Sequence, residues 1–292
     1  MHYSHLVLSA SGFRAFAFFG AIQAIRDADM HRPMRHVAGC SGGAIAAFAF
    51  CADVDPRKVA ERCAASVRDP ACGIHVVGPV RLSAWSQQGI AKATSIEALL
   101  RDILEETLSE RRMSLRDFAK ATGRELALWT TNLTRGCGQA LTMESHPDLD
   151  VVTAIMASMA IPLVYCPVDI DGELHVDGAV TEFVPTSAFP GVPPEQMLQI
   201  SLPPQPTPPG PGLANLLSAV FAAAFRHRAV GDGILSIDVP GPCLDVSNGF
   251  VVRFDVNEDI VWNQFGVGRD TVAAGLAARR RKFTSGDAPG ST

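Results

Sequence analysis

Short apolar runs alternate with glycine-containing turns and helical patterns at the start of the chain. Residues 5–10 form an apolar run that is followed by the turn "SGFRA" and by a helical pattern at residues 16–28. Residues 34–40 form a second apolar run, which leads directly into the helical segment "SGGAIAAFAFCA". Two strand–turn–helix units in close succession predict a mainly parallel sheet that is covered by helices.

The middle of the chain shows both helical and strand periodicity. Residues 94–110 carry one apolar face, and Thr94 and Glu97 have the spacing of a capping box. Further elements are expected as a short helix ending at Gly123, a buried strand at 125–133, a helix at 150–161 that Pro162 terminates, and a hairpin around "DIDGE" within 163–180.

The last third begins with the proline-rich segment 203–212, which predicts an irregular loop. The apolar helix expected at 213–227 is interpreted as core, with a flap on lipid as the alternative, and the sequence leaves open whether residues 203–228 form a moving lid. A strand at 250–256 and a helix at 270–282 are expected to close the fold. The pattern predicts one domain over residues 1–283 and a disordered tail at 284–292.

Composition narrows the function classes. The chain has 292 residues, of which 47% are hydrophobic, and a net charge of −5, so we expect no nucleic-acid partner. No apolar run is long enough to predict a membrane span. The seven cysteines are scattered and form no C-x-x-C pair, which favours reduced thiols in the cytoplasm over a disulfide framework or a metal site.

Ser41 is the first candidate for chemistry. It lies in "GCSGG", between Gly39 and Gly43, where an apolar run gives way to a helical segment. A G-x-S-x-G serine on a strand-to-helix turn is exposed to substrate, and the backbone N–H groups that follow it stabilise an oxyanion. The alternative is a small residue in a glycine-rich bend.

A nucleophilic serine needs a base, and the sequence offers two kinds. In a Ser-His-Asp order the available histidines are His146, His175 and His227, none of which lies in a glycine-rich late loop. Asp177, in contrast, is expected at the end of a strand, directly before Gly178. A carboxylate in that place accepts the serine proton directly if it lies within reach, whereas an isolated Asp-Gly is often only a turn.

Four segments, taken together and in order, resemble the patatin-like phospholipase family. They are "LVLSASGFRAFAFFGAIQAI", "VAGCSGGAIAA", "TTNLTRG" and "AIMASMAIPLVYCPVDIDGELHVDGAVTEFVP", within residues 6–185. "FDVNEDIVWNQFGVGRDTVAAGL" is similar to the family's last strand and helix. The resemblance implies a three-layer α/β/α sandwich with a mainly parallel central sheet, and a lipid acyl hydrolase that uses no cofactor or metal ion.

The resemblance also implies roles for individual residues. Ser41 would be the nucleophile and Asp177 the base of a catalytic dyad, each within a motif completed by Gly39, Gly43, Gly178 and Ala179. The oxyanion hole would be formed by Ser11, Gly12, Phe13, Arg14 and Gly42.

The loop at residues 10–15 departs from the family pattern of three glycines, a variable residue, Arg or Lys, and glycine. Only Gly12 and Arg14 match it, and Ala10 and Ser11 replace two glycines. A catalytically weak or silent protein that binds lipid or another protein is therefore the alternative function. A cysteine nucleophile at Cys40 is disfavoured because this residue precedes the apex of the turn.

We expect a lipid or phospholipid substrate and peripheral, transient membrane contact. The sequence does not determine the headgroup, the acyl position, the chain length or the oligomeric state.

Overall fold

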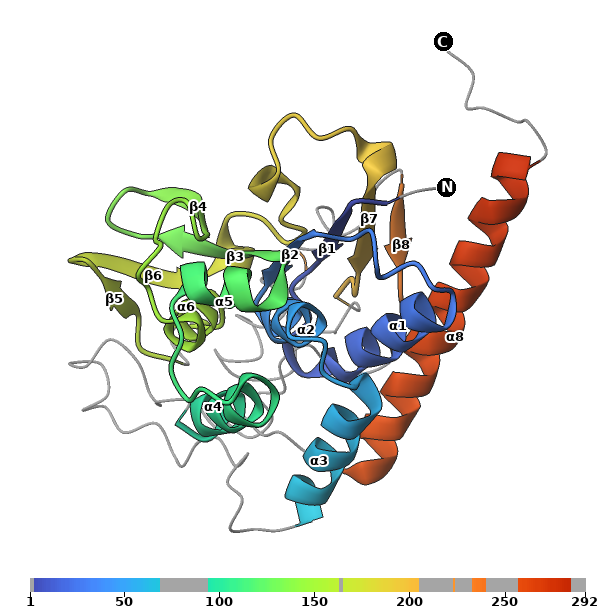
Figure 1. Ribbon diagram of the computed structural model, residues 1–292, viewed down its shortest axis with the longest axis horizontal. Coiled ribbons are helices and arrows are strands. Elements are labelled where there is room, and N and C mark those ends of the chain that lie inside the picture. Colours follow the sequence, from blue (N-terminus) through green and yellow to red (C-terminus); the bar gives the residue numbers. More distant parts are fainter. Residues whose placement is uncertain are drawn as a thin grey trace.

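A computed structural model of the chain describes residues 3–68, 94–162, 165–204, 223, 233–239 and 257–284. A central, mainly parallel sheet organises these residues, as expected from the sequence (Figure 1). Its strands are β1 (His5–Leu8), β2 (His36–Cys40), β3 (Glu125–Asn132), β4 (Cys137–Leu141), β5 (Val168–Ile170), β6 (Glu173–Asp177), β7 (Met197–Ser201) and β8 (Ile234–Ser236). The strand order is β5-β6-β3-β2-β1-β7-β8, and β4 also pairs with β3.

The direction of pairing changes at β3. The pairs β1–β2, β2–β3, β1–β7 and β7–β8 are parallel, whereas β3 runs antiparallel to both β4 and β6. Strand β4 pairs with the same β3 residues as the end of β2 and as β6, so β2 and β6 both lie on the side of β3 opposite β4. The end of β2, which leads to Ser41, therefore meets the end of β6, which carries Asp177. This arrangement brings two segments together that are far apart in the sequence.

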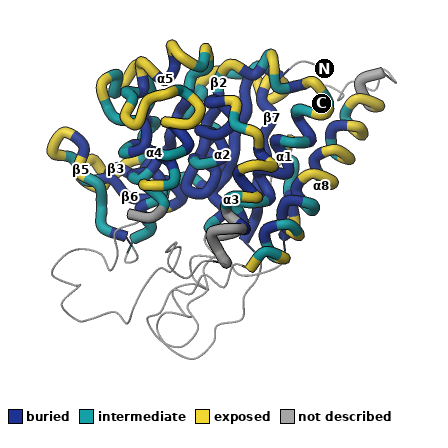
Figure 2. Tube along the Cα trace, turned by 60° about the horizontal axis from the view of Figure 1, so that its bottom comes forward, coloured by how far each residue is buried: buried dark blue, intermediate teal, exposed yellow. Residues whose placement is uncertain are grey.

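Alternation along the strands gives the sheet two apolar faces. Leu6 and Leu8 belong to the large core under the α-helices, and Val7 belongs to a smaller core on the opposite face. The α-helices are α1 (Phe16–Asp27), α2 (Gly42–Cys51), α3 (Pro56–Arg68), α4 (Thr94–Leu108), α5 (Leu115–Thr122), α6 (Val151–Ser158) and α8 (Glu258–Thr284). Strands β1, β2, β3 and β7 are almost entirely buried, whereas β5 lies at the edge of the molecule (Figure 2).

The smaller core is covered by the segment between β6 and β7. It contains three short 3-10 helices, Gly178–Val180, Thr186–Ala188 and Pro194–Gln196. Phe183 and Val184 of this segment pack on the sheet. The expected α/β fold class is confirmed, and in the described part of the chain this second layer consists of 3-10 turns.

Helix α8 lies alongside α1 and α3 (Figure 1). A Cβ atom at Gly268 would overlap the carbonyl oxygen of Ala17, and one at Gly20 would overlap that of Phe265. Glycines at these two positions therefore let the helix backbones approach each other. The expectation that the last helix begins near residue 270 was wrong, since α8 begins at Glu258. The helix therefore starts about three turns earlier than predicted.

Two predicted turns are present, and one predicted helix is shorter than expected. Helix α5 ends at Gly123, which has the left-handed φ of 64°, and β5 and β6 form the hairpin around "DIDGE". Helix α6 ends at Ser158, earlier than the predicted boundary before Pro162. The predictions for residues 205–222, 224–228, 250–256 and 285–292 lie outside the described residues, whereas Thr284, predicted as the start of the tail, is the last residue of α8.

Candidate active site

Ser41 occupies the sharp turn between β2 and α2. Its backbone has φ 54° and ψ −124°, a region that residues with a side chain rarely adopt. Its backbone N–H donates to Ser158 Oγ at 3.0 Å. The predicted strand-to-helix turn is therefore present, and its central residue is held in a strained conformation by the surrounding structure.

The two glycines that flank Ser41 allow this turn to pack closely. A Cβ at Gly39 would overlap the Gly43 carbonyl oxygen, and a Cβ at Gly43 would overlap the Ser9 carbonyl oxygen at the end of β1. Gly42 and Gly43 form the first turn of α2, where backbone N–H groups have no partner within the helix. The Gly42 N–H, directly after Ser41, is thus in the place from which hydrolases of this turn type donate to an oxyanion.

Asp177 ends β6 and is buried. Its backbone N–H donates to the Ala160 carbonyl at 2.9 Å, and its Oδ1 accepts the Ala179 N–H at 2.9 Å. Its own carbonyl accepts the Thr131 hydroxyl at 3.0 Å. Gly178 allows the following turn to pack on β3, because a Cβ there would overlap the Trp129 carbonyl oxygen.

The fold brings Ser41 and Asp177 together. The Ser41 hydroxyl lies close enough to the Asp177 carboxylate to lower its pKa as a hydrogen-bond donor. Burial raises the pKa of Asp177 to about 6, although hydrogen bonds from Ser41, the Ala179 N–H and Cys40 act in the opposite direction. A buried carboxylate with this pKa is charged at neutral pH and is a stronger base than an exposed aspartate, so it is suited to accept the Ser41 proton.

The predicted oxyanion loop lies against the nucleophile turn. A Cβ at Gly42 would overlap Ser11 Oγ, which places the two segments in direct contact. Residues Gly12–Arg14 form a 3-10 turn that includes the backbone of Phe13. Gly12 has φ 56°, whereas Ser11 has φ −146° and Ala10 is not among the residues with positive φ. Ala10 and Ser11, which replace two of the family's glycines, therefore occupy positions that do not require a positive φ. Gly12, which has a positive φ, is still a glycine.

Both the side chain and the backbone N–H of Arg14 have partners within the protein. The Arg14 guanidinium is buried and donates to the carbonyl oxygens of Leu202 at 2.8 Å and Pro203 at 2.7 Å, and its backbone N–H donates to the Ser11 carbonyl at 3.3 Å. These bonds anchor the loop to the end of β7. A direct part for Arg14 in the oxyanion hole stays a prediction.

The alternative nucleophile and bases are placed differently from the Ser41–Asp177 pair. Cys40 is fully buried, and burial next to Asp177 raises the pKa of its thiol well above the usual value, which keeps the thiol protonated. His175 is buried on β6, and its ring nitrogens face Thr130 Oγ1 at 2.9 Å and Asn132 Nδ2 at 3.4 Å. His146 contacts Ser145 in an exposed turn, and His227 lies outside the described residues.

Ser158, which the sequence pattern does not distinguish, contacts the Ser41 turn. Its hydroxyl is fully buried, accepts the Ser41 N–H and donates to the Trp129 carbonyl at 2.8 Å. It lies within the motif "AIMASMAIP", which was noted for its resemblance, but nothing in the local pattern distinguishes this serine from a helix-end residue.

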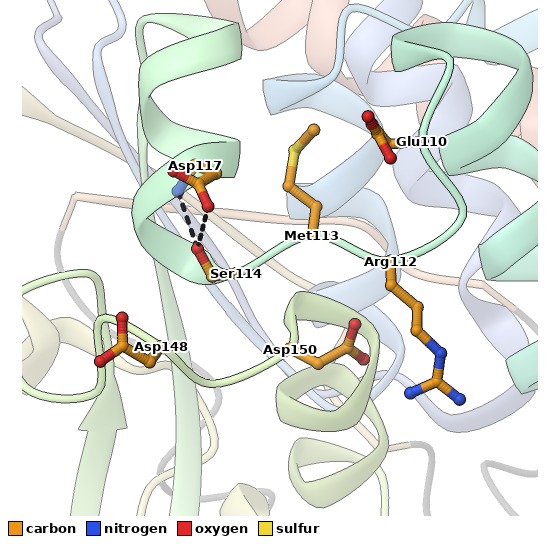
Figure 3. Close-up of a pocket in the computed structure, with 7 residues that line it drawn as sticks. All are labelled: Glu110, Arg112, Met113, Ser114, Asp117, Asp148 and Asp150. Atoms are coloured by element: carbon orange, nitrogen blue, oxygen red, sulfur yellow. Dashed lines mark hydrogen bonds between the residues drawn. The ribbon is translucent and has the colours of Figure 1, made fainter.

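A separate hollow of about 490 Å³ lies at the start of α5 (Figure 3). Its lining includes Asp117, Asp148, Asp150 and Glu110 together with Arg112. Ser114 caps α5 by accepting the Asp117 N–H, and Asp150 caps α6. Ser114 and Asp150 therefore serve as helix caps, and the hollow is separate from the Ser41–Asp177 pair.

Within the described residues, no group of three His, Cys, Asp or Glu side chains has the arrangement of a metal site. Among the helices in the described ranges, none combines the length and apolar character that crossing a bilayer requires.

The structure thus places a buried aspartate and a glycine-containing loop close to the strained strand-to-helix turn of Ser41. The family model for patatin-like phospholipase matches residues 6–190. The chain belongs to the patatin-like phospholipase family. It is 23% identical over 96 residues to the "Probable lipid hydrolase 463L" of Invertebrate iridescent virus 6, a match that spans 31% of the viral protein.

Two solved structures share the patatin-like fold. VipD from Legionella pneumophila has a TM-score of 0.58 and 15% sequence identity, over 95% of this chain and 67% of VipD. ExoU from Pseudomonas aeruginosa, solved as a heterodimeric complex with SpcU, has a TM-score of 0.50 and 16% identity, over 96% of this chain and 52% of ExoU. This chain thus spans about half the length of ExoU and less than a third of the viral relative.

Proposed function

We propose that this patatin-like protein is a lipid acyl hydrolase that cleaves fatty-acyl esters of phospholipid or lysophospholipid through Ser41 and Asp177. The observation that carries the proposal is the position of the buried Asp177 carboxylate beside the strained Ser41 turn, 3.9 Å from Cys40 Sγ and close enough to the Ser41 hydroxyl for that group to lower its pKa. Family membership supports lipid hydrolysis in general. We propose a cytoplasmic location and transient, peripheral contact with membranes.

The proposed reaction has two steps. Ser41 Oγ attacks the ester carbonyl carbon while its proton moves to Asp177, and the Gly42 N–H and the loop at Ser11–Phe13 donate to the oxyanion. When the carbon–oxygen bond to the alcohol breaks, Asp177 returns the proton to the leaving oxygen. Water then attacks the acyl-Ser41 ester with proton transfer to Asp177. When the bond from the acyl carbon to Ser41 Oγ breaks, Asp177 returns that proton to Ser41 Oγ, and the fatty acid is released.

Intact-mass labelling with a fluorophosphonate tests the nucleophile. The wild-type protein is expected to gain one adduct, Ser41→Ala none, and Asp177→Asn the same adduct at least about 100-fold more slowly, because the base is lost. Release of fatty acid from phosphatidylcholine and lysophosphatidylcholine vesicles, measured by mass spectrometry, then tests the substrate class.

A folded wild-type protein that gains no adduct and releases no fatty acid would contradict the proposal. It would favour the alternative of a silent protein that binds lipid or a partner protein. Labelling without fatty-acid release from either vesicle would retain the nucleophile and refute the proposed substrate class.

A further inference from the structure

The end of helix α6 contacts both reacting residues. Ser158, its last residue, accepts the Ser41 backbone N–H at 3.0 Å, and Ala160, two residues later, accepts the Asp177 backbone N–H at 2.9 Å. Ser158 lies 117 residues from Ser41 in the sequence, so this contact exists only in the folded chain. One short segment therefore binds the backbones of the nucleophile and of the base.

The same segment is fixed to the central strand. The Ser158 hydroxyl donates to the Trp129 carbonyl of β3 at 2.8 Å, and Thr131, two residues further along β3, donates to the Asp177 carbonyl at 3.0 Å. The Ser158 hydroxyl thus donates one hydrogen bond, to the Trp129 carbonyl of β3, and accepts one, from the Ser41 N–H. Alanine at this position would leave both the buried Ser41 N–H and the Trp129 carbonyl without this partner.

We propose that Ser158 is a positioning residue for acyl transfer, because its hydroxyl holds the Ser41 peptide in the positive-φ conformation that directs Oγ toward Asp177. This inference rests on the proposed function of the Ser41–Asp177 pair. Ser158 acts through the Ser41 backbone and takes no part in the exchange of protons. Loss of the bond releases the strained turn, and a displacement of about 1 Å at a reacting atom lowers rates by about 100-fold.

Three variants test the proposal on the full chain. Ser158→Ala removes the hydroxyl without overfilling its site, Ser158→Thr retains it, and Ser114→Ala is the matched control because Ser114 also accepts one backbone N–H, at the start of α5. Thermal unfolding of each variant is recorded beside the second-order rate of fluorophosphonate labelling.

Ser158→Ala is expected to label about 10- to 100-fold more slowly than the wild type. With an ester substrate, kcat should fall while KM stays within about twofold, since the bond orients the nucleophile rather than the substrate. The midpoint of the pH dependence should not move, because the Ser158 hydroxyl does not contact the Asp177 carboxylate. Ser158→Thr should restore most of the rate, and Ser114→Ala should lower stability without slowing labelling.

Hydrogen exchange gives a readout independent of chemistry. The Ser41 amide should exchange faster in Ser158→Ala than in the wild type, and at the wild-type rate in Ser114→Ala.

The outcomes separate the two proposals. If the wild type labels and Ser158→Ala labels at the same rate, or if only KM changes, Ser158 is not a positioning residue and the proposed function stands. If Ser114→Ala slows labelling as much as Ser158→Ala, the effect is general loss of stability and the positioning role is refuted. If folded wild-type protein does not label at all, both proposals fail.

Discussion

His5 and His36 stack face to face on neighbouring strands, with ring centroids 4.5 Å apart and ring planes inclined by 15°. Phe189 packs edge-on against both rings, and His36 Nδ1 lies 2.8 Å from Glu125 Oε2 on β3. These residues lie at the start of their strands, whereas Ser41 follows the end of β2. The two histidines therefore lie at the end of the sheet opposite the active site, where their contacts affect stability and not the reaction.

Replacement of His5 should reduce the loss of stability in mild acid. Burial, and then the neighbouring His36, lower the pKa of His5, whereas Glu125 acts in the opposite direction. Because the unfolded chain then binds a proton at higher pH than the folded one, the free energy of unfolding falls as the pH drops below about 6.5 through the folded pKa. His5→Phe keeps an aromatic ring in the stack and removes this proton.

Urea unfolding at pH 7.5 and 5.0 measures the effect. The decrease in unfolding free energy between the two pH values should be smaller for His5→Phe than for the wild type. Ser145→Ala, in an exposed turn, removes no titratable group and is the control that should leave the decrease unchanged. An equal decrease in all three proteins would show that His5 does not couple stability to pH.

The labelling rate should follow the protonation of Asp177. Burial raises the pKa of this carboxyl to about 6, and only the charged form accepts the Ser41 proton. The rate should therefore rise as the pH increases through about 6 and reach a plateau above about 7. Fluorophosphonate labelling between pH 4.5 and 8.5 checks this, and a rate that does not change across the range would exclude Asp177 as the base.

Asp177→Asn should make the protein more stable as well as less active. The folded carboxyl releases its proton near pH 6 and the unfolded one near pH 4, so ionisation disfavours the folded state increasingly between these values. Two pKa units correspond to at most about 3 kcal/mol, so a gain of about 1–3 kcal/mol in unfolding free energy is expected at pH 8. Asparagine retains an acceptor for the Ala179 N–H and a donor for Ser41.

The dependence on pH distinguishes this cause from a general effect of the substitution. Unfolding in urea at pH 8 and pH 4 should show the gain only at pH 8, because at pH 4 the native wild-type carboxyl is already protonated. A variant that is less stable than the wild type at both values would contradict the burial of a charged Asp177.

Gly12→Ala should slow labelling by about 10- to 100-fold. Gly12 has φ 56°, which disfavours any residue with a Cβ by about 1–2 kcal/mol, and relief of that strain would redirect the N–H groups of the oxyanion loop. Gly136→Ala is a matched control, since Gly136 has φ 68° in the turn between β3 and β4 and a Cβ there meets no atom within 4 Å.

Both variants should lose similar stability in thermal unfolding, but only Gly12→Ala should label slowly. Equal labelling rates in the two variants would show that the oxyanion loop does not require glycine at position 12.

Several elements follow from local pattern alone. An apolar run before "GCSGG" predicts the turn at Ser41, and "DIDGE" between alternating residues predicts the β5–β6 hairpin. Gly123 predicts the end of α5. In each case the signal lies within a few residues, because strand alternation, turn formation and helix capping are governed by neighbours in the sequence.

Other elements depend on packing that local rules do not include. Gly266 and Gly268 lower the helix propensity of the region before residue 270, yet α8 continues through both. Gly268 permits the close approach of α8 to Ala17 of α1, and this packing outweighs the propensity. The antiparallel strand β4 was not anticipated, since "CGQAL" has little apolar alternation and pairs with β3 through its backbone.

The sequence by itself determined the nucleophile turn, the Asp-Gly motif and the family to which both belong, because each is a short pattern of residue types. It did not determine the distance between Ser41 and Asp177, the raised pKa of that carboxyl or the contact of Ser158 with the Ser41 backbone. Those properties arise only when β6 pairs antiparallel with β3 and the end of α6 packs beside the β2–α2 turn. Tertiary structure decides them because hydrogen bonds and desolvation depend on which groups meet in space, whatever their separation along the chain.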